Sequence, residues 1–197
     1  MRLVGDPLRR RRRSRGQALV EFALVIPIFL TIVVAIAEFA FVLTVKTGVS
    51  FAGQDATQLA AELGNTPDAD VLILRQIEKD LQTPVDSAKV TTVTIFWTDS
   101  TGATKAADTW TKPGSYYSTI LGVTIPYSPG AQNYLWSNRC NILSVVGCAS
   151  GHTTMDWIGV SVSYQYSWVT PLPGLVGLGS SAPLFVETHI SRMEPVQ

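Results

Sequence analysis

The stretch RRRRRSRGQALVEFALVIPIFLTIVVAIAEFAFVL, residues 9–43, decides how this chain is organised. Five consecutive arginines precede an apolar run that contains two glutamates, Glu21 and Glu38. Residues 22–45 carry no charge except Glu38. As a helix, these 24 residues measure about 36 Å, which exceeds the hydrocarbon core of a bilayer, about 30 Å. The stretch predicts one membrane-spanning helix and raises the question of how two carboxylates are tolerated in it.

The formal net charge of zero hides a strong asymmetry along the chain. Residues 1–16 hold seven arginines and one aspartate and carry +6, so residues 17–197 carry −6. A basic block directly before an apolar segment sets membrane topology, with the basic side in the cytoplasm. We therefore expect a single-pass protein with a cytoplasmic N-terminus and an extracytoplasmic C-terminal domain. The acidic remainder argues against nucleic acid as a partner.

Two other interpretations of the apolar segment stay open. An export signal begins in the same way, and Ala35-Ile36-Ala37 matches the A-x-A pattern of a signal-peptidase site. After that cut, however, the released protein would carry an exposed apolar stretch, residues 39–43, close to its new N-terminus. A plain membrane anchor explains the length of the segment but not Glu21.

The stretch RGQALVEFALVIPIFL, residues 15–30, resembles the beginning of the TadE-like family, pseudopilins and minor pilins of the tight-adherence (Flp) branch of type IV pili. VSVSYQYSWVTPL, residues 160–172, and SRMEP, residues 191–195, resemble the end of that family. The N-terminal likeness combines a basic leader, a glycine, a glutamate five residues later, an aromatic residue next and a proline within the apolar run. Residues 65–155 carry no such likeness.

In that family a membrane aspartic peptidase, the prepilin peptidase, cuts the precursor after the glycine on the cytoplasmic side. The resemblance implies cleavage between Gly16 and Gln17, with Glu21 and Phe22 as the fifth and sixth residues of the mature chain. Related pilins often have tyrosine at the sixth place, so Phe22 is a mild departure. The resemblance also implies the bacterial cytoplasmic membrane, other tight-adherence subunits as partners, and a role in pilus assembly and surface adhesion. Whether the chain enters the fibre stays open.

A newly formed α-amino group would explain Glu21 in physical terms. Such a group is largely protonated at neutral pH, and Glu21 lies one helical turn beyond Gln17 on the same face. The carboxylate can pair with the amine of its own chain, or of a neighbouring subunit, where the pair would favour one axial register. Alternatively, Glu21 stays solvated among the lipid headgroups. Glu38 lies about 25 Å farther along, and we expect it to reach the outer interface or to pair with Lys46.

The helical spacing of apolar residues continues to Leu63, and Gly64-Asn65 supplies a stop. We divide the chain into a basic cytoplasmic leader, residues 1–16, a transmembrane and extended helix, residues 17–64, and an extracytoplasmic head domain, residues 65–197. Small residues recur every fourth position in this helix, which suits either close packing with another helix or contact with the chain's own sheet. They are Gly48, Ala52, Ala56, Ala60 and Gly64.

Residues 67–82 have the spacing of an amphipathic helix, with Thr66-Pro67 as its start. Residues 89–98, 158–168 and 184–193 are predicted strands, and residues 103–157 are expected to form long loops with short strands. The fold class is α+β: a long N-terminal transmembrane helix that extends into a pilin-like head with a second helix and a small antiparallel sheet. The apolar face of the second helix would contain Val71, Leu74, Ile77 and Leu81.

Several side chains in the head domain could suggest a ligand, but each has a simpler interpretation. The stripe Tyr164, Tyr166 and Trp168 is expected to pack in the core rather than to bind a surface or a sugar. Asp68 and Asp70 at the start of the second helix are explained by the helix dipole. No motif for catalysis or phosphate binding occurs, so we expect no enzyme and no cofactor.

The chain has two cysteines, Cys140 and Cys148, both in the part expected outside the cytoplasm. There they can form a disulfide, which would stabilise the fold by roughly 2 to 3 kcal/mol. A metal site made from both cysteines and His152 lacks a fourth ligand and is the weaker hypothesis. The alternative function is a membrane-anchored or signal-peptidase-released binding module that recognises a ligand through residues 103–157.

Overall fold

The structure is a computed structural model that describes residues 7–82, 84–99, 101–142, 148, 152, 154–175, 177 and 181–195. The chain forms two compact units. We call them the helical unit, Met1–Phe41 with Trp168–Ser181, and the sheet unit, Val42–Ser167 with Ala182–Gln197. The long helix α1, Pro7–Leu63, contributes residues to both.

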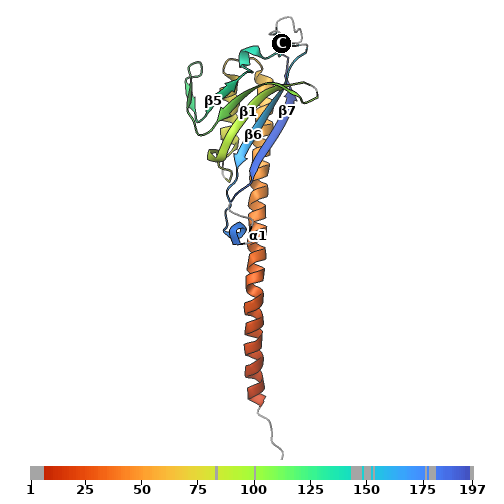
Figure 1. The fold of residues 1–197 in the computed structure, drawn as a ribbon, viewed down its shortest axis with the longest axis vertical. Helices are drawn as coiled ribbons and strands as arrows, with labels where there is room; N and C mark the ends of the chain where they lie inside the picture. The colour runs from red at the N-terminus through yellow and green to blue at the C-terminus, as the bar shows by residue number, and fades with distance from the viewer. Residues whose placement is uncertain are drawn as a thin grey trace, which may run out of the picture. The chain divides into compact units, whose positions relative to one another are not determined.

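Helix α1 ends as predicted but begins earlier. It starts at Pro7 rather than Gln17, because arginine is a good helix former and proline suits the first helical turn. At the other end, Gly64 has a φ of +53° and donates its N–H to the carbonyl of Ala60 at 3.2 Å. This left-handed conformation is typical of glycine at a helix C-terminus. Figure 1 shows α1 as one continuous helix.

Five strands form an antiparallel sheet in the order β5-β2-β1-β6-β7 (Figure 1). A separate two-stranded sheet pairs β3 with β4, so the predicted α+β class is confirmed. Two short 3-10 helices, η1 and η2, and a short helix α3 complete the described elements. The bounds are β1 Val90–Thr98, β2 Thr104–Thr111, β3 Tyr116–Ser118, β4 Val123–Ile125, β5 Ser128–Gln132, β6 Trp157–Gln165, β7 Leu184–Arg192, η1 Ser87–Lys89, η2 Trp136–Asn138 and α3 Leu172–Leu175.

The core of the sheet unit lies between one face of the sheet and α1. Alternate residues of β6 point into it, because successive side chains of a strand face opposite sides. On α1, Gly53, which follows Ala52 of the row of small residues, also lies against the sheet: a Cβ at Gly53 would lie 2.9 Å from the His189 ring. The Thr57 hydroxyl also donates to the Gly53 carbonyl at 2.7 Å. Fully buried members of this core include Ala52, Ala56, Ala60, Val93, Ile95, Ile158, Val160 and Val162.

The row of small residues, which had two interpretations, therefore lies on the chain's own sheet unit. At the two ends of the row, Gly48 lies beside Val85 and Gly64 lies beside Asn141. Both end residues therefore also lie against other parts of the same chain. Small side chains let the sheet approach the helix backbone closely, as the fully buried Ala52 and Ala56 show.

Helix α2, Ala69–Asp80, buries the predicted face, but its start differs from the expectation. Thr66 does not cap it: its hydroxyl donates to the Leu63 carbonyl at 2.6 Å. Asp68 precedes the helix with a φ of +56° and makes no side-chain cap.

Strand β6 is shorter than predicted, because beyond Gln165 the N–H of Tyr166 donates to the Pro183 carbonyl at 3.1 Å. Tyr164 and Tyr166 are buried, as expected for core residues.

On the outer face of the sheet, Phe96 of β1 lies opposite Gly159 of β6. A Cβ on Gly159 would lie 2.2 Å from the tip of the Phe96 ring. The glycine therefore leaves the space that the ring occupies, and Phe96 is only 7% exposed.

Candidate functional site

The residues that the sequence places at a processing site lie within α1. Gly16, Gln17, Glu21 and Phe22 are all helical and exposed. The side-chain amide of Gln17 donates to Oε1 of Glu21 at 3.1 Å, so the two residues share one face of the helix, four positions apart. A positive group at the position of Gln17 would therefore lie within one helical turn of a carboxylate.

Gly16 has no packing role among the residues that the structure describes. A Cβ built at this position meets no atom within 4 Å, and its backbone is helical, which any residue can adopt. A helix interior disfavours glycine by about 1 kcal/mol relative to alanine. The glycine thus weakens the helix locally and leaves the bond to Gln17 sterically open.

The part of α1 that follows Glu21 presents an exposed apolar surface. An 18-residue window within residues 16–63 reaches a mean hydropathy of 2.8, and none of the window is buried by the rest of the chain. Phe22 is 64% exposed, and Leu24 and Ile28 are similar. Among the described residues this is the helix that is long and apolar enough to cross a membrane. Such a surface needs lipid or other apolar helices around it.

Glu38 differs from the expectation that it reaches interfacial water or pairs with Lys46. Its side chain is 5% exposed, and both carboxylate oxygens accept backbone hydrogen bonds. The N–H of Val169 donates to Oε1 at 3.1 Å, and the N–H of Thr170 donates to Oε2 at 2.8 Å. The reason is that the connection between β6 and β7 returns to α1 within the helical unit, which no local pattern reveals.

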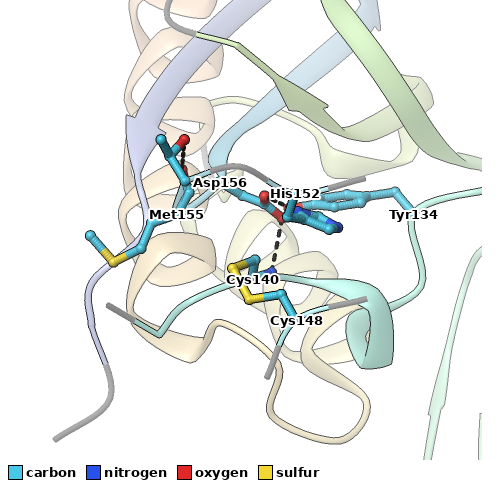
Figure 2. The surroundings of a disulfide bond; sticks show 7 residues. Tyr134, Cys140, Cys148, His152, Met155 and Asp156 are labelled. Atoms are coloured by element: carbon cyan, nitrogen blue, oxygen red, sulfur yellow. Dashed lines mark hydrogen bonds and ion pairs between the residues drawn. A yellow bond between two sulfur atoms is a disulfide. The ribbon is translucent and has the colours of Figure 1, made fainter. Parts of the chain in front are cut away.

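The two cysteines are joined in a disulfide in the sheet unit, with their Cα atoms 5.3 Å apart (Figure 2). The Nδ1 atom of His152, the third residue of the metal hypothesis, contacts Oδ1 of Asp156, and its ring stacks on Trp97 with ring centroids 4.4 Å apart. Sulfur atoms in a disulfide are not thiolate ligands, so this metal hypothesis is wrong. The part of the chain that the structure describes contains no other group of acids, histidines and cysteines suited to a metal ion.

Asp156 forms several of the hydrogen bonds around the disulfide. Its Oδ2 accepts from the Tyr134 hydroxyl at 2.8 Å and from the Cys140 N–H at 3.0 Å (Figure 2). The Met193 N–H donates to its backbone carbonyl at 3.0 Å. The contacts connect the disulfide, the segment before η2 and the end of β7 to one buried residue, the first two through its carboxylate and the last through its backbone. Burial and the neighbouring carboxylate raise the pKa of Tyr134, so its hydroxyl stays a donor at neutral pH.

A second cluster of polar residues, around Asp70 and Arg139, was not predicted from the sequence. Asp70, which we assigned to the helix dipole, forms an ion pair with Arg139, whose side chain is 0% exposed. Asp108 of β2 accepts the Tyr134 N–H at 2.5 Å, and burial together with the nearby Asp70 raises the pKa of Asp108 to about 6. Asp68 accepts from the Ser118 hydroxyl. Asp70 and Asp68 thus connect the start of α2 to loops of the sheet unit, and Asp70 and Asp108 are buried.

The geometry thus defines a class: a protein with one helix able to span a membrane and an α+β unit stabilised by a disulfide and buried ion pairs. Comparison with protein families gives one finding: residues 16–58 match the model of the TadE-like proteins. The resemblance found in the sequence is confirmed over this segment, which supports a protein associated with the tight-adherence pilus in general. Comparisons with curated proteins and with solved structures gave no match.

Proposed function

We propose that this chain is a minor pilin or pseudopilin of a tight-adherence pilus, without enzymatic activity. Its N-terminus lies in the cytoplasm, α1 crosses the cytoplasmic membrane, and the sheet unit lies outside. A prepilin peptidase removes the leader after Gly16. One observation supports this most: the TadE-like match begins at Gly16, and Glu21 lies four positions beyond Gln17, in side-chain contact with it.

Cleavage is favoured by the local properties of the chain. Peptidases bind extended backbone, whereas the Gly16-Gln17 bond lies inside α1. The peptidase must therefore unwind this part of the helix, and glycine lowers the free energy that the unwinding requires. A residue without a side chain also offers no obstacle before the cut bond.

The product of cleavage gives Glu21 its role. The new amino group of Gln17 is largely protonated and lies one turn from the carboxylate. The pair neutralises a charge that would be costly in an apolar environment. In the precursor, the Gln17 side chain contacts Glu21, so a donor already lies at this position. In an assembled bundle, the amine of one subunit can pair with Glu21 of the next and set the axial register.

The apolar surface of α1 supports the same proposal. Phe22 and most of the apolar residues that follow it, as far as Leu43, are exposed, so they can contact lipid before assembly and neighbouring helices within a fibre. The same surface can serve both environments because side-chain packing, rather than exclusion of water, favours helix contacts in apolar surroundings. The implied partners are the prepilin peptidase and other subunits of the tight-adherence pilus.

The mature N-terminus tests the proposal. Mass spectrometry of the protein purified from cells that express the pilus system should find Gln17 as the first residue. A chain that begins at Glu38 would instead indicate signal peptidase, and a chain that keeps its arginines would indicate an uncut anchor.

A matched pair of variants sharpens this experiment. Gly16→Val should block removal of the leader, because a β-branched side chain then stands before the cut bond. Gly5→Val, which changes a leader glycine outside the motif, should be trimmed normally. Trimming at Gln17 that persists in the Gly16→Val protein would refute the assignment of the site.

A further inference from the structure

The connection between β6 and β7 contacts α1 within the helical unit. β6 ends at Gln165 and β7 begins at Leu184, and the helical unit includes Trp168–Ser181. Figure 1 shows the short blue helix α3 beside α1. The contact includes the two hydrogen bonds from Val169 and Thr170 to Glu38. Val169 and Thr170 therefore lie at the level of Glu38 on the helix, and α3 follows them directly in the chain.

The helix surface at this level is apolar. Ile36 and Phe39, on either side of Glu38 in the sequence, are 65% and 63% exposed, and Phe41 is 44% exposed. These side chains continue the surface that we assign to lipid. A segment bound to Glu38 accordingly lies beside the lipid-facing part of α1.

The composition of the connection suits the same environment. No charged residue occurs between Asp156 and Glu187. Val169 is 61% exposed, and Trp168 is of a type enriched at membrane interfaces. Pro171 and Pro173 have no N–H group and therefore need no acceptor.

Irregular backbone is tolerated at membrane depth only where its polar groups are satisfied by protein or water. Glu38 satisfies two of these groups, the N–H donors of Val169 and Thr170, and the donors in turn stabilise its carboxylate. We propose that residues 168–175 form a second membrane contact, an interfacial loop that lies among the phospholipids of the outer leaflet beside α1 and is held there by Glu38. This contact rests on the membrane insertion of α1 in the proposed function.

Depth-dependent quenching tests the contact in the full-length protein. A fluorophore is attached to Val169→Cys, to Phe29→Cys within the span, or to the exposed head position Tyr117→Cys, while the native disulfide stays oxidised. The proteins are reconstituted in phosphatidylcholine and phosphatidylglycerol vesicles that contain phosphatidylcholine spin-labelled either near the headgroup or near the chain end.

We expect headgroup-proximal spin labels to quench the probe at residue 169 strongly and the probe at residue 117 weakly. The probe at residue 29 should respond most to the chain-end labels. If residue 29 is quenched but residue 169 responds no more than residue 117, the loop contact is refuted and the membrane anchor stands. If residue 29 is not quenched, the spanning helix itself is refuted, and the loop contact with it.

Variants of Glu38 test how the loop is held. Glu38→Leu removes both acceptors and should abolish most of the quenching at residue 169 while leaving that at residue 29. Glu38→Gln keeps one acceptor oxygen and should retain part of the quenching at residue 169. Glu62→Leu, which replaces an exposed glutamate on the same helix, is the matched control and should change nothing. Unchanged quenching in Glu38→Leu would overturn the role of Glu38.

Discussion

Arg139 and Asp70 form an ion pair inside the sheet unit, with exposed side-chain fractions of 0% and 6%. Asp70 lies in the first turn of α2, whereas Arg139 follows η2. The guanidinium carbon also lies 5.1 Å from the centre of the Tyr134 ring. The pair therefore connects the second helix to the segment that carries the disulfide. Removing one partner of a buried pair leaves an uncompensated charge, which is more harmful than losing the attraction alone.

We expect Arg139→Met to lower the free energy of unfolding by about 3–5 kcal/mol. Urea unfolding of the full-length protein in detergent, followed by tryptophan fluorescence, measures the loss. Lys105→Ala is the matched control, because the Lys105–Asp99 pair is 46% and 36% exposed and should contribute little to stability. Similar losses in the two variants would contradict the importance of the buried pair.

Asp108 should make stability depend on pH. Burial, followed by the nearby Asp70, raises its pKa from 3.8 to about 6. The folded state therefore binds the proton more tightly than the unfolded chain, so the stabilisation is present below pH 3.8 and is lost as the pH rises through about 6. Asp108→Asn imitates the protonated acid and keeps the acceptor for the Tyr134 N–H.

We accordingly expect Asp108→Asn to melt at a higher temperature than the wild type at neutral pH, with the difference fading as the pH falls toward 3.8. Thermal unfolding across this range measures it. A wild-type protein that is the more stable one at neutral pH would show that the charged form of Asp108 is favoured in the fold.

The disulfide closes a short loop, since Cys148 lies eight positions after Cys140. Its removal should lower the free energy of unfolding by about 2–3 kcal/mol through the larger entropy of the unfolded chain. Unfolding of the Cys140→Ser/Cys148→Ser protein, compared with the wild type, measures this loss. Adding reductant should weaken the wild type alone, and an equal response of the double variant would mean that reductant acts elsewhere.

Glu21→Ala should leave membrane insertion intact, since the change makes the span more apolar, but it should weaken pilus assembly. Electron microscopy of surface pili, with membrane fractionation of the same cells, measures both. Glu62→Ala on the same helix serves as the control and should assemble normally. Normal piliation with Glu21→Ala, in a strain shown to need this subunit, would contradict the charge pairing.

Features that depend on neighbouring residues could be predicted from the sequence. The end of α1 at Leu63 follows from the glycine after it, and the buried face of β6 follows from strict alternation. The contact between Gln17 and Glu21 follows from the helical repeat. The roles of Gly16 and Glu21 in processing and assembly stay predictions.

Contacts between distant residues could not be predicted. Asp70 and Arg139 are 69 positions apart, and Glu38 and Thr170 are 132 apart. The local pattern around Asp70 is already explained by a helix start, and the pattern around Glu38 by a helix end near water. Only the folded chain shows which donors reach these acids: Arg139 was not predicted for Asp70, and the partner considered for Glu38, Lys46, was wrong. The start of α1 at Pro7 was missed because the leader was treated as separate from the helix.

The pairing of Phe96 with Gly159 has a consequence for the evolution of this fold. The ring occupies the volume of a missing side chain, so neither position can change freely while the other is kept. Homologues that place alanine or a larger residue where Gly159 stands should carry a smaller side chain where Phe96 stands. An alignment of such chains would then show the two positions varying together, because their side chains share one closely packed volume on the sheet.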